Sequence, residues 1–299
     1  YPIGEEENNK PDFEGTFHVN RLIEIFRNLE KEPEAKIKEF LELLWQVRYT
    51  FDSNVIKWIT NLDSKEEHLE LTSISKSKNS ANYTYFGRNV IEKSNEQMLQ
   101  SVLYFTGDYL RQYWLTPYLC RIIFYKETSL DLLEKIDNVM SLSTLQDKEI
   151  SFNLCDAYYN DNDRLSLVKE LQSNKGTGFK HYWFQKLEYV LWKHWTDTND
   201  DKFKNYRISS KNSVEHVYPQ NPEYKDRLIK DIIDDFGNLA LLNVGQNSSY
   251  SNQEVAKKKI DFYHKTTYDS LKLSFIYQND DWDKETINTH AIEMISELV

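Results

Sequence analysis

Several residue types are scarce in this 299-residue chain. With only 8 Gly and 6 Pro, it has few turn-formers, which favours helices over architectures built from many short strands. Its two cysteines, Cys120 and Cys155, show no CxxC or Cys/His spacing, which predicts buried free thiols in a reducing cytoplasm rather than a zinc site or a disulfide. No apolar run is long enough to span a bilayer, and the acidic segment 1–15 is not a signal peptide. We therefore expect a cytoplasmic, mainly helical protein with no membrane partner.

Positive charge is also in short supply. The formal net charge of -11 argues against a nucleic-acid-binding surface that covers the whole protein. The charge is uneven, because residues 202–265 hold 11 Lys and Arg against 8 Asp and Glu. Chance unevenness explains so small an excess equally well. The chain begins with Tyr rather than Met, so we expect it to be a piece of a longer protein.

Helical periodicity dominates what is present. Ser94 has the features of a helix N-cap, with Gln97 three residues later as in a capping box, and Pro117 should kink or end the helix that follows. Residues 61–88 are polar and predict a long loop or a small hairpin. Apolar residues recur at helical spacing in five further segments, which are 17–60, 129–145, 179–195, 251–264 and 284–299.

The hydrophobic pattern of the sequence changes near residue 200. Short apolar runs in 205–247 predict two strands around a helix or loop at 223–235. We therefore predict two domains, a helical domain over 1–200 and a strand–strand–helix module with a helical tail over 201–299. The predicted fold class is mainly α, with the helical domain followed by this module and a C-terminal helix.

One set of polar residues carries the chemistry. The stretch 214-VEHVYPQNP-222 places Glu215 beside His216, Asn238 opens GNLALLN, and Asn247 follows nine residues later. Phosphodiester hydrolysis needs a base with a pKa near neutrality and a hard divalent cation held by oxygen ligands. We expect His216 to be the base, Glu215 and Asn247 to hold Mg²⁺ or Mn²⁺, and Asn238 to fix the loop that carries His216.

This arrangement has one geometric requirement. Neighbouring residues of a strand point to opposite faces, so Glu215 and His216 serve one site only where the backbone bends. Pro219 is typical of the end of a regular strand, which makes a bend at this place a reasonable expectation.

The same residues carry a resemblance. The string EHVYPQN, GNLALLN, NSSYSN and KKK resembles the HNH nuclease module at the C-terminus of GmrSD-type modification-dependent restriction endonucleases, and the step from Asn238 to Asn247 resembles the HNH domains of RNA-guided nucleases. The resemblance covers about 50 residues and implies a ββα-metal fold for the strand–strand–helix module. It thereby implies a helical connecting domain over 1–200 and an HNH-type nuclease domain over 201–299. It also implies His216 as general base, Glu215 and Asn247 as metal ligands, and Asn238 as the structural asparagine.

The resemblance also implies a function. We expect the chain to be the effector part of an antiviral restriction system that hydrolyses modified phage DNA, nicking one strand at each site. Members of the family usually carry an N-terminal nucleotide-dependent sensor domain with a DGQQR-like motif. No such motif occurs here, so we expect a missing N-terminal NTPase domain or a partner subunit to supply it.

Simpler explanations stand beside these. The chain could be a non-catalytic helical module with a degenerate HNH shell that partners a DNA-sensing subunit, and RNA is an alternative substrate. Three adjacent lysines, 257–259, cannot share one helix face, and we favour Lys258 as a weak contact to DNA phosphate. Asn252 is favoured as a helix N-cap. We expect packing roles for the remaining candidates, which are His181, His194, Trp183, Tyr189 and Trp192.

Overall fold

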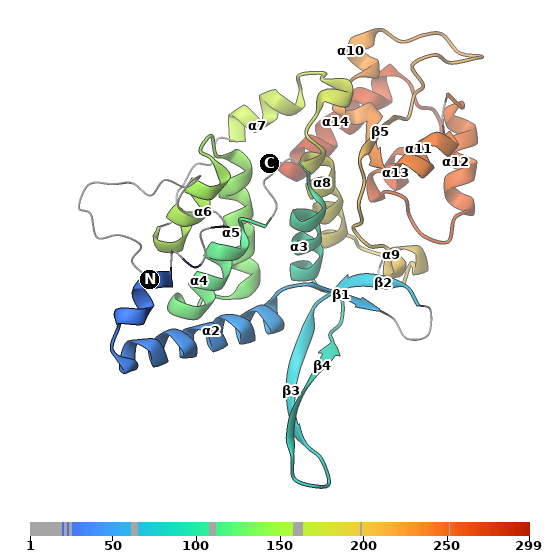
Figure 1. Ribbon diagram of the computed structural model, residues 1–299. Helices are drawn as coiled ribbons and strands as arrows, with labels where there is room; N and C mark the ends of the chain where they lie inside the picture. Colours follow the sequence, from blue (N-terminus) through green and yellow to red (C-terminus); the bar gives the residue numbers. More distant parts are fainter. Residues whose placement is uncertain are drawn as a thin grey trace.

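The computed structural model describes residues 20, 23, 26–60, 65–107, 112–157, 164–197, 199–250 and 252–299. Much of the start of the helical segment predicted for 17–60 lies outside these residues, and a short 3-10 helix, η2 (Arg27–Lys31), is described within it. The structure is mainly helical with three small antiparallel sheets (Figure 1). The mainly α class is therefore confirmed. Within the described residues, no helix is both long and apolar enough to cross a membrane.

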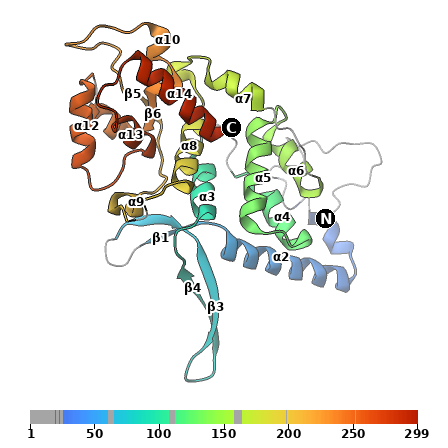
Figure 2. The same cartoon turned by 180° about the vertical axis from the view of Figure 1, so that it is seen from behind.

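The first half of the chain is a helical layer. Helices α3 and α8 pack side by side near the centre of the molecule, and α2, α4, α5 and α6 lie to one side of them (Figures 1 and 2). The helices are α2 (Glu34–Asn54), α3 (Asn95–Phe105), α4 (Leu115–Tyr125), α5 (Ser129–Leu142), α6 (Asp147–Asp156), α7 (Arg164–Leu171) and α8 (His181–Lys193).

The helix predicted between the Ser94 cap and Pro117 ends earlier than expected, at Phe105. Ser94 does cap α3 by accepting a hydrogen bond from the Gln97 backbone N–H. The Gln97 side chain completes no capping box, because its Oε1 accepts no hydrogen bond from the described residues, while its Nε2 donates to the Leu69 carbonyl 3.0 Å away. Pro117 does not end a helix either, and instead occupies the first turn of α4. A proline is tolerated there because the first turn leaves its N–H groups without helical partners.

The first half is not purely helical. Strands β1 (Lys57–Thr60) and β2 (Glu67–Glu70) form one antiparallel pair, and β3 (Thr72–Lys78) and β4 (Thr84–Val90) form a second. This part of the chain is therefore mainly helical with two small antiparallel sheets. Of the two structures predicted for 61–88, the hairpin is confirmed over its described part, and the β3–β4 hairpin projects away from the body (Figures 1 and 2).

The second half holds the third sheet and short helices. Strand β5 (Ser213–His216) pairs with β6 (Leu239–Leu242), which confirms the two predicted strands. Between them, only α10 (Lys230–Ile233) and the 3-10 turn η4 (Phe236–Asn238) are helical. The other elements are η3 (Gly176–Gly178), α9 (Asp201–Asn205), α11 (Val244–Tyr250), α12 (Val255–His264), α13 (Leu271–Ile276) and α14 (Lys284–Leu298).

Helix α12 starts later than predicted. It begins at Val255, and its N-cap is Glu254 rather than Asn252. The prediction that Asn252 caps this helix is therefore wrong. The C-terminal helix is confirmed as α14, where Asp283 and Thr286 form a capping box.

Strand β6 separates two hydrophobic cores. Leu239 and Leu241 pack into the main core of α3, α5 and α8, whereas Ala240 and Leu242 pack into a second core with α12 and α13. This alternation follows from the two-residue period of a strand. Because the main core contains residues from both sides of position 200, the two halves pack together, and a boundary at residue 200 stays a prediction.

Two smaller expectations can be checked in the packing. Trp183 and Tyr189 are buried, and Trp192 packs against the main core, so the aromatic stripe of α8 belongs to the core as expected. Cys120 and Cys155 are free, as predicted, but they are half-buried rather than fully buried.

Candidate functional site

The β5–β6 pair places the candidate residues. Glu215 lies opposite Ala240, and His216 lies opposite Leu239 at the end of the ladder. The two side chains therefore start on opposite faces of the strand. Beyond His216 the pairing of the two segments continues by one more backbone hydrogen bond, from the Val217 N–H to the Asn238 carbonyl at 2.9 Å.

Asn238 fixes the loop after His216. It is fully buried, and its Oδ1 accepts from the Tyr218 backbone N–H at 2.8 Å and from Trp282 Nε1 at 3.0 Å. Its Nδ2 donates to the carbonyls of Tyr218 at 3.2 Å and Ile233 at 2.9 Å. These four bonds use the full capacity of the amide. Asn238 therefore orders the backbone, and its burial prevents it from touching a substrate.

His216 has a carboxylate partner that the sequence did not suggest. Its Nε2 lies 3.1 Å from Oδ1 of Asp234, and both side chains are about nine-tenths buried, with exposed fractions of 10% and 12%. The Gln220 amide nitrogen lies 3.4 Å from the same ring nitrogen. The bond to the carboxylate is shorter and charge-assisted, so it decides the tautomer. Nε2 then carries the proton, and Nδ1 carries the lone pair.

Burial keeps this imidazole neutral. Desolvation lowers the pKa of His216, and the neighbouring Asp234 carboxylate opposes that shift only in part. The net direction is downward from the ordinary value of 6.5. A neutral ring at neutral pH has a free lone pair that can accept a proton.

The loop between α7 and α8 packs against Asp234. The Gly176 N–H donates to the Asp234 carbonyl at 3.0 Å. Gly176 adopts φ 55°, and a Cβ at this position would lie 2.7 Å from Oδ1 and Cγ of Asp234. The position therefore needs glycine for both its left-handed backbone and its close approach. This loop precedes the predicted nuclease domain in sequence but contributes to the same site.

Glu215 is held by a buried lysine. Lys258 Nζ lies 2.6 Å from Glu215 Oε1 and donates to the carbonyls of His216 at 2.8 Å and Val217 at 3.2 Å. Desolvation raises the pKa of Glu215 and lowers that of Lys258, and each charge opposes the shift of the other. The prediction that Lys258 contacts DNA phosphate is wrong, because this residue is fully buried and its ammonium is bound within the protein.

Asn247 approaches the same strand from α11. Its Nδ2 donates to Ser213 Oγ at 2.5 Å and to the Val214 carbonyl at 3.4 Å. Within the part of the chain that the structure describes, no hydrogen bond to its Oδ1 is found. With the amide nitrogen bound to the strand, the oxygen is the atom of Asn247 that can act as a ligand.

One cavity of about 330 Å³ joins three of the predicted residues, Glu215, His216 and Asn247. Glu215 and His216 both line it although they start on opposite faces of β5. Asn252, which we expected at a helix terminus, also lines this cavity, whereas Asn238 and Lys258 do not. The other lining residues are Thr177, Val214, Pro219, Gln220 and Ser248.

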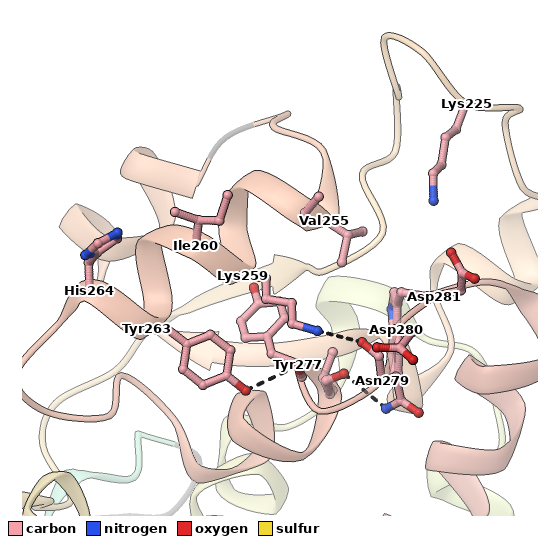
Figure 3. A pocket seen from close by; sticks show the side chains of 13 residues that line it. Lys225, Val255, Lys259, Ile260, Tyr263, His264, Tyr277, Asn279, Asp280 and Asp281 are labelled. Atoms are coloured by element: carbon pink, nitrogen blue, oxygen red, sulfur yellow. Dashed lines mark hydrogen bonds between the residues drawn. The ribbon is translucent and has the colours of Figure 1, made fainter.

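A larger cavity of about 580 Å³ lies on a different face of α12 (Figure 3). Lys259 and Tyr263 line it, and they donate to the backbone carbonyls of Asn279 at 2.9 Å and Tyr277 at 3.2 Å. On helix α12, Lys258 therefore faces Glu215, whereas the next residue, Lys259, faces this second cavity. None of the predicted catalytic or metal-binding residues lines it.

The donor atoms of the smaller cavity suit a hard cation. The described residues contain no cluster of three or more His, Cys, Asp or Glu side chains. The cavity offers one carboxylate and amide oxygens, and none of its described lining residues is Lys or Arg. Oxygen donors of this kind fit Mg²⁺ or Mn²⁺ better than a soft metal.

Two further histidines, His194 and His181, lie away from this site. His194 contacts Glu297 at the surface, with Nδ1 2.9 Å from the carboxylate. It contributes no side chain to the cavity of His216. His181 is likewise absent from the lining of that cavity.

Comparison with known proteins places the region that holds this site. No curated protein and no solved structure matches the chain significantly. A family model described as GmrSD restriction endonucleases, C-terminal domain, matches residues 168–297. The match begins within α7 and ends within α14, so it includes the Gly176 loop, the β5–β6 pair and α11. Residues 168–297 therefore belong to the family of GmrSD restriction endonuclease C-terminal domains.

Proposed function

We propose that this region is an HNH-type endonuclease that hydrolyses DNA phosphodiesters with Mg²⁺ or Mn²⁺. One observation supports the proposal most, namely that Glu215, His216 and Asn247 line the same cavity. The membership in a restriction endonuclease family agrees with it. In this proposal, β5, β6 and α11 are the two strands and the helix of a ββα-metal module.

His216 is the general base of the proposed reaction. Its Nε2–H donates to Asp234, which leaves the Nδ1 lone pair to accept a proton from the attacking water. Asp234 is a positioning residue, because it fixes the tautomer and the ring without touching the substrate. Asn238 and Lys258 hold the backbone around the imidazole through bonds to Tyr218 and to the His216 carbonyl.

Glu215 and Asn247 would hold the cation through carboxylate and amide oxygens. A bound divalent ion supplies positive charge that polarises the phosphate and stabilises the leaving oxygen. The cavity needs such a charge, since none of its described lining residues is Lys or Arg. Lys258 forms an ion pair with Glu215, and this contact holds the carboxylate in a fixed position at the cavity wall.

The match to restriction endonucleases also supports a proposal for the wider role. We infer an effector in an antiviral restriction system that acts on modified DNA, with a nucleotide-dependent sensor domain or partner subunit. A single catalytic site cuts one strand, so the isolated chain should nick DNA.

A plasmid assay tests the proposal. Supercoiled plasmid, modified or unmodified, is incubated with Mg²⁺ or Mn²⁺ and either wild-type protein or His216→Ala. His264→Ala is the matched control, because this exposed histidine lies at the C-terminal end of α12 outside the small cavity. We expect nicking by the wild type and the control and a loss of at least about 100-fold in His216→Ala. Equal cleavage by His216→Ala and wild type removes His216 from the mechanism.

Metal binding separates this proposal from a non-catalytic module. Calorimetric titration with Mn²⁺ should show uptake that is lost in the double variant Glu215→Gln, Asn247→Ala. Glu293→Gln on the exposed face of α14 is the control for a lost surface carboxylate. Uptake that is absent in the wild type, or unchanged in the double variant, favours the degenerate module.

A further inference from the structure

The β3–β4 hairpin is a projecting arm with an unusual surface. Both strands are seven residues long, and the hairpin extends away from the helical body in both views (Figures 1 and 2). Its aromatic side chains are exposed, with Tyr83 72%, Phe86 68% and Tyr85 53% accessible. Large aromatic groups exposed together on a protruding element point to a contact surface.

The arm is basic within an acidic protein. Residues 71–91 contain Lys76, Lys78 and Arg88 and no Asp or Glu, whereas the whole chain has a net charge of -11. The segment 202–265 is therefore not the only basic part of the chain. A positive element on a negative protein attracts a polyanion to that element and away from the remaining surface.

The strand register gathers these groups on one face. Lys76 lies opposite Phe86, and Lys78 lies opposite Thr84. Directly paired residues share a face, and the face repeats every second residue. Lys76, Lys78, Phe86 and Arg88 therefore all lie on one face of the ribbon. The opposite face carries the three serines of β3 and Tyr85.

The two lysines of this face are free to bind a ligand. Within the described residues, neither Lys76 nor Lys78 has an ion-pair partner, and both are exposed. Arg88 differs, because its guanidinium lies 2.9 Å from the Asp52 carboxylate of α2. Arg88 thus anchors the ribbon to the body, and the two lysines lie farther out toward the turn.

The arm is ordered at both ends. At the turn, the Asn79 side-chain oxygen accepts from the N–H groups of Ala81 at 3.0 Å and Tyr83 at 2.9 Å. At the base, Thr72 Oγ1 donates to the Asp52 carbonyl at 3.2 Å. An ordered ribbon loses less conformational entropy on binding than a flexible loop does.

We propose that the β3–β4 hairpin is a duplex-binding arm that contacts the phosphate backbone of double-stranded DNA through Lys76 and Lys78. Phe86 on the same face and Tyr83 at the turn add apolar contact with the sugars and base edges of the groove. A two-stranded antiparallel ribbon fits the major groove, and unpaired lysines are suited to phosphate. The choice of DNA as the polyanion rests on the proposed function, but the contact does not require cleavage.

Binding measured without catalysis tests the arm. Fluorescence anisotropy of a labelled 40-bp duplex is recorded in EDTA at several salt concentrations with the full chain. We expect Lys76→Gln with Lys78→Gln to weaken binding by about tenfold or more and to reduce the salt slope by about two, since two phosphate contacts are lost. The control is Lys31→Gln with Lys169→Gln, which removes the same charge from exposed sites on η2 and α7.

A second pair of variants separates aromatic contact from charge. Tyr83→Ala with Phe86→Ala should weaken binding about fivefold with an unchanged salt slope, whereas Phe124→Ala, an exposed aromatic of α4, should have no effect. Circular dichroism confirms that each variant is folded. Wild-type affinity and slope in the double lysine variant overturn the proposal, and so does an equal loss in the lysine control. Because His216→Ala should bind normally, the two proposals fail separately: undiminished cleavage by His216→Ala together with arm-dependent binding rejects only the proposed nuclease mechanism.

Discussion

Two antiparallel ribbons in this protein use the same backbone pairing for opposite purposes. In β5–β6, every residue of β6 is buried, and the side chains of β5 are bound to neighbours on both faces. In β3–β4, nearly all residues of β4 are exposed. The difference lies in what surrounds each ribbon, since two cores enclose the first and only the base of the second touches the body.

The lysines show the contrast most clearly. Lys258 is fully buried beside the first ribbon, where it neutralises Glu215 and holds two backbone carbonyls. Lys76 and Lys78 are exposed on the second ribbon and bind no carboxylate of the described chain. The same residue type is therefore structural in one ribbon and available for a ligand in the other.

Removal of the buried lysine should have the largest effect. Lys258→Met leaves the Glu215 carboxylate buried without its partner, and breaking a buried pair in this way costs about 3–5 kcal/mol. We expect that loss in the free energy of unfolding measured with urea. Lys257→Met, at the exposed neighbouring position of α12, is the control. A change below about 1 kcal/mol in Lys258→Met contradicts the structural role.

The Asp234–His216 pair should control the pH dependence of cleavage. The neutral ring is the active form, so the rate should rise with pH to a plateau, and the inflection should lie below pH 6.5 because burial lowers the pKa of His216. Asp234→Asn removes the charge that partly raises this pKa, so the inflection should move to lower pH. The plateau rate should fall about 10- to 100-fold, as for other partners that orient a ligand or base. An unchanged pH profile would limit Asp234 to packing.

Gly176 should affect the site through Asp234. Gly176→Ala places a methyl group 2.7 Å from Oδ1 of Asp234 on a backbone with φ 55°, which should cost about 1–3 kcal/mol. Cleavage should fall with the same shift in pH profile as in Asp234→Asn. Gly178→Ala is the matched control, because its new Cβ would lie 3.8 Å from its nearest neighbour, the Lys175 Cβ. Equal effects of the two glycine substitutions exclude a specific role for the close approach.

The sequence predicted the elements with strong local signals. Helices α8 and α14 follow from apolar periodicity, and strands β5 and β6 follow from short apolar runs between loops. The break between α3 and α4 was missed, because Pro117 is compatible with both the end of one helix and the start of another. Local patterns do not decide between these two positions.

The candidate site also contains both residues that local sequence patterns predict and residues that they do not. Glu215, His216 and Asn247 share a characteristic spacing, and the structure places them around one cavity. Asp234 and Gly176 carry no such pattern, since their contact depends on a loop that precedes His216 by 40 residues and on the tertiary fold. Lys258 was assigned to DNA because three consecutive lysines do not reveal which of them faces inward. That orientation is set by the packing of α12 against β5.

The smallest expected effect completes the comparison of the ribbons. Lys76→Gln with Lys78→Gln should change the free energy of unfolding by no more than about 0.5 kcal/mol, because exposed side chains without partners contribute little to stability. The same urea titration used for Lys258→Met measures it, and the DNA affinity of the same sample should fall. A loss of stability of several kcal/mol would show that these lysines support the fold, and the two ribbons would then not differ in the way their lysines are used.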